Sequence, residues 1–169
     1  GLGGSARPGA IGRGAATLTV RYGGAGYHDR IASTAWTSFT DSDQTVFASR
    51  GQYLEGSSYT TGGFWLEPEF DLGSGVTLGL GGRFGGAGAV APADEASGTA
   101  AVDESWITPV GRAGIGWAAL EWLTVRANVD HAFRAPNLDD LTARQQTGPG
   151  YQFENPGLRP EQALTVETG

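Results

Sequence analysis

Cysteine, methionine and lysine are all absent from this chain of 169 residues. Without cysteine the chain has neither a disulfide framework nor a thiolate metal site. Without lysine it has no Schiff-base nucleophile and no phosphate-binding lysine of a Gly-x-x-x-x-Gly-Lys-Ser/Thr loop. These absences exclude several classes of enzyme and nucleotide-binding protein.

Positive charge is also scarce, because the 11 basic residues are all arginines and the net charge is -7. The isoelectric point is near 4.7. Binding to nucleic acid depends largely on neutralising phosphates with basic side chains. An acidic chain of this kind is poorly suited to that task, so we expect no nucleic-acid partner.

Long apolar runs are missing as well, and the longest uninterrupted one covers only residues 117–120. A membrane-spanning helix needs about 20 consecutive apolar residues. The strands of a transmembrane β-barrel alternate between lipid and water, so each gives only a weak hydropathy signal. The sequence therefore predicts no spanning helix and stays compatible with a membrane barrel.

Alternation of apolar and polar residues is the main pattern that is present. In the clearest segment Leu123, Val125 and Val129 alternate with Arg126 and Asn128. A period of two predicts a β-strand with one apolar and one polar face. Seven segments show such patterning to different degrees: 17–22, 27–39, 59–72, 76–84, 107–117, 123–133 and a last strand that begins near Leu164 and Val166. The predicted fold is all-β, an antiparallel meander of about seven strands.

The predicted connections alternate between short and long. The short ones are 23–26, 73–75 and 118–121, and the long ones are 40–57, 85–105 and 136–160. Transmembrane barrels have tight turns on the periplasmic side and long loops outside. We expect 85–105, rich in Gly, Ala and acids, to be mobile, and 1–14 to be loop-like.

Candidate catalytic and metal-binding residues are few. His28 and His131 lie on different predicted strands, and neither a Gly-x-Ser-x-Gly nor a His-Glu-x-x-His motif occurs. We interpret both histidines as wall residues and predict no enzyme activity, cofactor or metal site. Acid pairs occur at Asp41/Asp43, Asp94/Glu95, Asp103/Glu104 and Asp139/Asp140. We interpret them as solvated loop charge; the alternative, calcium binding, lacks the spacing of a calcium loop.

Aromatic residues concentrate near the predicted strand ends. Rings at these positions are typical of the girdles that mark the two membrane interfaces of a barrel, and cross-strand packing in a water-soluble sheet is the alternative. The residues concerned are Tyr22, Trp36, Phe39, Tyr59, Phe84, Trp106, Trp117, Trp122 and Phe133.

Two motifs stand near the C-terminal end. The first is Phe133-Arg134-Ala135-Pro136, and the second is Asn155-Pro156-Gly-Leu158-Arg-Pro160-Glu161. Pro136 lacks an N–H and so ends strand pairing where a loop begins. Arg134 and Glu161 are placed to pair across the mouth of the hairpin, and we interpret the motif residues as architectural.

These motifs resemble the late barrel segment of TonB-dependent outer-membrane receptors, and the resemblance extends over about two thirds of the chain. It implies that residues 1–169 are an open part of a roughly 22-stranded barrel, without the plug domain and the final strands. It also implies a bacterial outer-membrane location and TonB-driven import of a metal chelate such as a ferric siderophore or cobalamin.

The implied partners are outer-membrane lipid, TonB through the plug domain, and a small chelate at the external loops. In the haem-importing branch the two motifs bracket a loop histidine, and residues 137–154 contain none. The resemblance therefore does not support haem as substrate. Two alternatives remain: a small complete outer-membrane barrel of structural or adhesion type, and a soluble carbohydrate-binding β-sandwich, which would bury the face assigned here to lipid.

Overall fold

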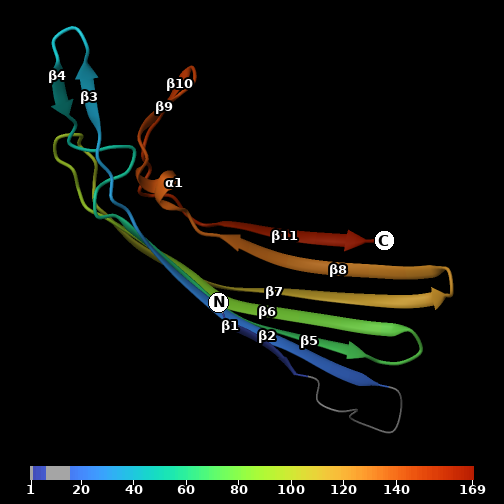
Figure 1. Cartoon of the computed structure of the whole chain (residues 1–169). Helices are drawn as coiled ribbons and strands as arrows, with labels where there is room; N and C mark the ends of the chain where they lie inside the picture. The colour runs from blue at the N-terminus through green and yellow to red at the C-terminus, as the bar shows by residue number, and fades with distance from the viewer. Residues whose placement is uncertain (1, 7–15) are drawn as a thin grey trace.

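The computed structural model describes residues 2–6 and 16–169, and most of the chain forms one antiparallel sheet (Figure 1). The sheet has seven strands in the order β1-β2-β5-β6-β7-β8-β11, and strands that are adjacent in this order pair with each other. The strands are β1 Leu2–Ala6, β2 Thr17–Arg30, β5 Ser58–Asp71, β6 Val76–Ala91, β7 Val102–Leu120, β8 Leu123–Arg134 and β11 Glu161–Thr168. This confirms the predicted all-β meander.

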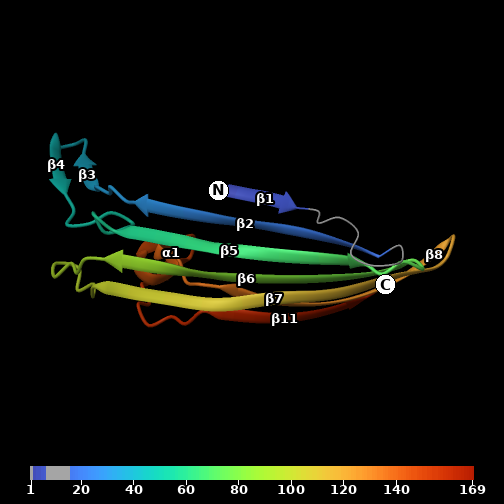
Figure 2. The same cartoon turned by 90° about the horizontal axis from the view of Figure 1, so that it is seen from below.

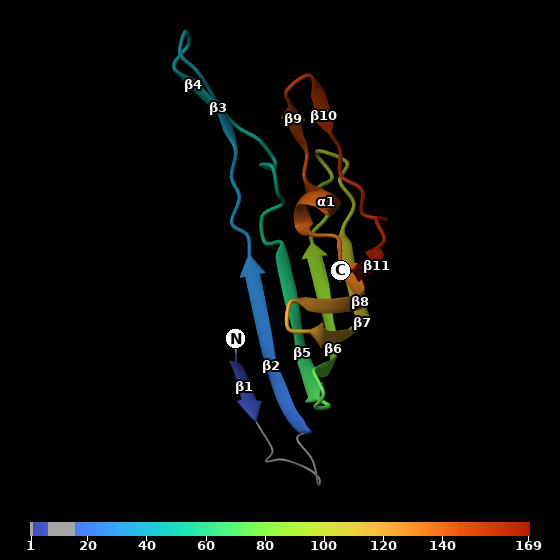
Figure 3. The same cartoon turned by 90° about the vertical axis from the view of Figure 1, so that its right-hand side faces the viewer.

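The two ends of the sheet differ. At one end β5 turns into β6 through 72–75, and β7 turns into β8 through Glu121 and Trp122. Gly73, Ser74 and Gly75 all have positive φ there, which glycine adopts at little cost. The opposite end carries the β3–β4 hairpin (Trp36–Phe39, Gln44–Phe47), the helix α1 (Leu138–Thr142) and the β9–β10 hairpin (Gln145–Thr147, Gly150–Gln152). Both hairpins project beyond the sheet (Figures 1 and 3).

The sheet is a single curved layer (Figure 2). In the described part of the chain its outermost strands, β1 and β11, do not pair with each other. One face is apolar and open: Phe64 is 62% exposed, Ile107 70% and Ile115 48%. A water-soluble sandwich would cover such a face with a second sheet, and no described element does so.

The predicted turn at 23–26 is wrong. These residues lie inside β2, where Gly23 pairs with Trp65 and Gly26 with Gly62. Glycines indicated a turn, but here they belong to a strand, and Gly23 lies under the Trp65 ring of the next strand. The loop-like assignment of 1–14 is also wrong for Leu2–Ala6, which forms β1 against β2. The rest of that segment lies outside the described residues.

The predicted mobile loop 85–105 is much shorter in the structure. β6 continues to Ala91 and β7 begins at Val102, so Asp103 and Glu104 belong to a strand. The remaining connection is ordered by backbone hydrogen bonds of 3.0 Å in both directions between Asp94 and Thr99. The small residues of β6 in this segment are compatible with a flexible loop and with close strand pairing. Because they pair with β7, they form a strand.

A small core lies at the loop end. Leu54, Ala89, Val102, Leu138 and Leu141 are buried together, and Tyr59 and Trp106 pack against them. Tyr59 and Trp106 are therefore not interface aromatics, and Trp36 and Phe39 lie on the projecting hairpin β3–β4. Among the described residues no helix is long and apolar enough to cross a membrane.

Candidate functional site

The two C-terminal motifs meet at the junction of β8 and β11. Arg134 and Glu161 are register partners, and Arg134 Nη1 lies 3.3 Å from Glu161 Oε1. Arg134 Nη2 also lies 2.9 Å from Asp140 Oδ2. The ion pair expected from the sequence is present, and it links the strand ends to α1.

The connection after Pro136 begins with a helix cap. Asn137 accepts a hydrogen bond of 2.8 Å from the Asp140 backbone N–H, and Asp140 accepts one of 3.1 Å from the Asn137 backbone N–H. This reciprocal capping box starts α1 directly after the strand ends. Pro136, buried at this point, thus marks the change from strand to helix.

The second motif forms a turn that returns the chain to the sheet. The Asn155 side chain accepts a hydrogen bond of 3.3 Å from Gly157 N–H, and its carbonyl accepts one of 3.3 Å from Leu158 N–H. Members of both motifs line one small hollow: Arg134, Pro136, Leu158 and Glu161. Phe133 and Ala135 line a different hollow on the sheet, and the functional role of the motif residues stays a prediction.

Arg50 links the loops at this end of the sheet. Its guanidinium donates to Thr99 Oγ1 at 2.7 Å, to the Gln52 carbonyl at 2.9 Å and to the carbonyl of the fully buried Thr142. These acceptors belong to three separate connections, 48–57, 92–101 and 135–160. We call residues 48–57, 92–101 and 135–160 the loop cluster.

A second arginine reinforces the loop cluster. Arg144 Nη1 donates to the Ser97 carbonyl at 2.7 Å, and its Nε lies 3.0 Å from Glu154 Oε2. Glu154 accepts a further hydrogen bond from Thr99 at 3.2 Å. Burial by itself raises the pKa of Glu154, but a backbone hydrogen bond and the Arg144 charge outweigh it and lower that pKa.

Two acids that the sequence analysis interpreted as solvated, Asp94 and Asp139, accept hydrogen bonds within the loop cluster. Asp94 accepts hydrogen bonds from Ser97 at 2.6 Å and from Ser49 at 2.9 Å, and the bond from Ser97 is the main cause of its lowered pKa. Asp139 accepts a bond of 3.1 Å from Tyr53. Burial, helped by this bond, raises the pKa of the Tyr53 hydroxyl.

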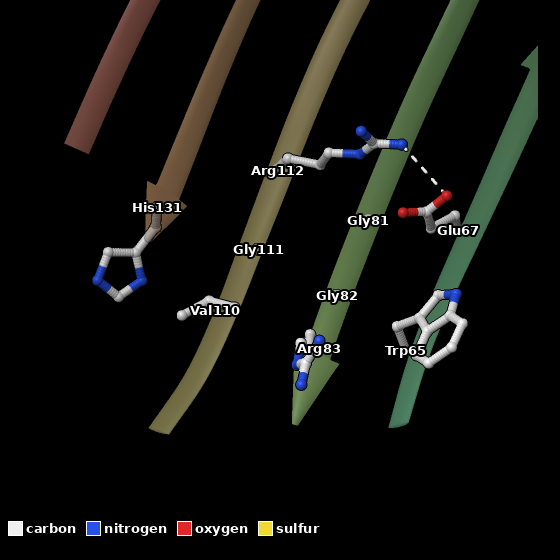
Figure 4. Close-up of a pocket in the computed structure, with 9 residues that line it drawn as sticks. All are labelled: Trp65, Glu67, Gly81, Gly82, Arg83, Val110, Gly111, Arg112 and His131. Atoms are coloured by element: carbon white, nitrogen blue, oxygen red, sulfur yellow. Dashed lines mark ion pairs between the residues drawn. The ribbon is translucent and has the colours of Figure 1, made fainter. Parts of the chain in front are cut away.

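The polar face of the sheet holds a hollow with charged walls (Figure 4). We call it the arginine hollow; it is lined by Trp65, Glu67, Gly81, Gly82, Arg83, Val110, Gly111, Arg112 and His131. Arg112 reaches across β6 and its Nη2 lies 3.3 Å from Glu67 Oε2. In the described part of the chain no acid pairs with Arg83.

Glycines make room for the large side chains of this hollow. A Cβ at Gly81 would lie 2.7 Å from Arg112 Cγ, and one at Gly23 would overlap the Trp65 ring. Gly81 therefore lets the Arg112 side chain lie flat against the neighbouring strand. Gly81, within the Gly-rich run of β6, thus permits close packing across the sheet.

The two histidines occupy different places. His28 lies in β2, where its Nδ1 is 2.8 Å from Thr60 Oγ1. The pairing of β8 with β7 ends, on the side of the loops, at Asp130 opposite Arg112. His131 is the next residue of β8. It thus lines the hollow where the two strands separate, a position that the alternation of β8 alone did not indicate.

The sequence did not single out Arg50 or Arg83. For Arg83 a signal existed, because it is the one charged residue of the glycine-rich strand β6. No local signal identified Arg50, since its partners are remote in sequence. Among residues 2–6 and 16–169 no three His, Asp or Glu side chains are grouped so that they could hold a metal ion.

Comparisons with known proteins agree with this geometry. A family model described as "TonB dependent receptor-like, beta-barrel" matches residues 6–169. A solved double mutant of the Serratia marcescens hemophore receptor HasR, in complex with its hemophore HasA and heme, is similar in fold, with a TM-score of 0.60 and 14% identity. That match covers 90% of this chain and 30% of the HasR chain. No curated protein matches the chain significantly.

Proposed function

Because this chain belongs to the TonB-dependent receptor β-barrel family, we propose that it forms part of an outer-membrane transporter that imports a metal chelate. The chain spans about 30% of the length of the HasR chain that it matches. The proposal therefore concerns the intact receptor, in which further strands close the barrel and a plug domain contacts TonB. In this assignment residues 1–169 are one part of the barrel domain.

The observation that carries the proposal is the contrast between the two sheet faces. The apolar face exposes Phe64, Ile107 and Ile115, and none of the described elements covers it. The other face carries the ion pairs Arg21–Glu69 and Arg112–Glu67. A wall with lipid on one side and a water-filled lumen on the other requires this arrangement.

The position of the connections indicates which end of the sheet faces the cell exterior. The short turns lie at one end, and the loop cluster and the β3–β4 hairpin lie at the other (Figure 1). In outer-membrane barrels the long loops face outward. We therefore assign the loop cluster to the cell exterior, where a small chelate would first bind, and the turns 72–75 and 121–122 to the periplasm.

The substrate class is a metal chelate such as a ferric siderophore or cobalamin. HasR was solved with heme and its hemophore, but residues 137–154 of this chain contain no histidine, and His28 and His131 lie on strands. A small complete barrel is less favoured because β1 and β11 do not pair in the described sheet. The exposed apolar face disfavours a soluble carbohydrate-binding sandwich.

The test is uptake of radiolabelled iron chelates by cells that express the intact receptor. We expect receptor in the outer-membrane fraction and uptake that requires both TonB and the proton gradient. Receptor without the TonB-contacting segment is the matched control and should bind chelate without importing it. Recovery of the receptor in the soluble fraction, or uptake that is indifferent to TonB, would reject the proposal.

A further inference from the structure

The arginine hollow continues toward the loop cluster as a second hollow. The two share Arg83, Val110 and His131, and the second extends to Tyr59 and Ala135 at the loop end of the sheet. Glycine and alanine form much of its floor, at Gly81, Gly82, Gly85, Gly86 and Ala87. A trough with small residues along its floor thus runs from the loop end to the middle of the polar face.

Arg83 is the unpaired charge in this trough. Arg112 is matched by Glu67 at 3.3 Å, while no carboxylate of the described residues pairs with Arg83. Its Nε lies over two glycines, since a Cβ at Gly63 or Gly85 would be 3.4 Å from it. In Figure 4 Arg83 lies on β6 between Val110 and Trp65, and it lines the hollow with them.

The surrounding charges leave the trough positive on a protein of net charge -7. The arginine hollow contains Arg83, Arg112 and one acid, Glu67. Arg112 and Glu67 form an ion pair, so Arg83 is the excess charge there, and the neighbouring hollow toward the turn end adds Arg126 and two acids, Glu69 and Asp130. Excess positive charge is therefore confined to the part nearer the loops.

We propose that this trough is a binding subsite for an anionic, carboxylate-bearing metal chelate, with Arg83 as its principal anchor. The inference rests on the proposed transport function and names the charge class of its substrate. The planar guanidinium of Arg83 donates paired hydrogen bonds to a carboxylate. The Trp65 ring supplies an apolar wall, and His131 supplies a further polar group from β8.

Equilibrium binding to the intact receptor in detergent tests this subsite. The probes are the iron(III) complex of citrate, which carries carboxylates, and the uncharged iron(III) complex of a trihydroxamate. Wild type should bind the citrate complex more tightly. Arg83→Gln should weaken its binding by about ten- to a hundredfold, as expected for a lost charged hydrogen bond, and leave the trihydroxamate complex unaffected.

Arg30→Gln is the matched control, since Arg30 is an exposed arginine at the end of β2 and lines neither hollow. It should change neither affinity. Binding of the trihydroxamate complex alone would overturn the anionic subsite and keep the transport function. Failure to bind either complex, together with absent TonB-dependent uptake of any chelate, would overturn both. An Arg83→Gln variant that is less stable but unchanged in affinity would assign Arg83 to a contact within the protein and overturn the subsite.

Discussion

At the scale of single residues, the position of a side chain on β8 decides what a charge there costs. Val129 lies in the middle of the strand on the apolar face and pairs with Ala113 and Val166. We expect Val129→Arg to destabilise the intact barrel by about 2 to 4 kcal/mol in lipid, because the guanidinium would enter the hydrocarbon. Denaturant unfolding in lipid vesicles measures this.

Two variants on the same strand serve as controls. Asn128→Arg places the charge at the same depth on the polar face and should cost under about 1 kcal/mol. Val125→Arg places it on the apolar face near the turn and should cost roughly 0 to 1 kcal/mol. Equal costs for Val129→Arg and Asn128→Arg would mean that the two faces have been assigned wrongly.

Arg50 should contribute strongly to the stability of the loop cluster, because it donates hydrogen bonds to acceptors on three loops. Arg50→Lys keeps the charge but cannot reproduce the planar set of donors. The carbonyl of the buried Thr142 then loses its Arg50 donor, and we expect a loss of about 1 to 3 kcal/mol in loop stability. Hydrogen exchange should become faster in 92–101 and 138–144, while β5 and β6 stay protected. Arg30→Lys, which alters an exposed arginine, should change neither region.

At the scale of elements, β5 and β6 approach each other closely where both contain glycine. A Cβ at Gly63 would lie 2.8 Å from the Phe84 carbonyl oxygen, whereas one at Gly82 would meet nothing within 4 Å. Gly63→Ala must push backbone apart and should cost about 1 to 3 kcal/mol. Gly82→Ala should be neutral or stabilising by roughly 0.5 kcal/mol. The difference in denaturation midpoint between the two variants checks this, and equal midpoints would contradict the close approach.

The stability of the loop cluster should depend on pH through Asp94 and Glu154. Both have pKa values below their ordinary ones in the folded protein, so the stability that they contribute is present above the ordinary value and is lost as pH falls through the lowered one. We expect residues 92–101 to loosen below about pH 4, before the strands unfold. Hydrogen exchange at neutral and acid pH measures this. The double variant Asp94→Asn, Glu154→Gln should show a flatter pH dependence, and an unchanged profile would exclude these two acids as its source.

At the scale of the whole molecule, the isolated 169-residue chain should not form a stable monomer in plain buffer. No described strand pairs with the outer sides of β1 and β11, and open strand edges invite association. Burying the polar face instead would trap charges such as Glu69 and Asp130 at several kcal/mol per ion. Analytical ultracentrifugation with and without detergent checks this. A monomer with a sharp thermal transition in detergent-free buffer would contradict the lipid-facing assignment.

Several features could be predicted from the sequence because they depend on local patterns. Alternation over 123–133 sufficed to identify a strand with two unlike faces, since side chains alternate at every residue. The Gly-Ser-Gly turn at 73–75 was predictable because positive φ favours glycine. Pro136 indicated a strand end because it has no N–H to donate. The motifs around Arg134 and Glu161 indicated the family and one ion pair.

Only the tertiary structure decided the features that depend on neighbours distant in the chain. Glycines at 23, 24 and 26 suit a turn and a strand equally well, and pairing with β5 places them in a strand. Ser49, Arg50 and Arg144, which lie far away in sequence, donate hydrogen bonds that hold 92–101 to the other loops. The unpaired state of Arg83 depends on which acids the register of β5 and β7 brings near it. Such pairings are set by the register of the whole sheet, which no local pattern encodes.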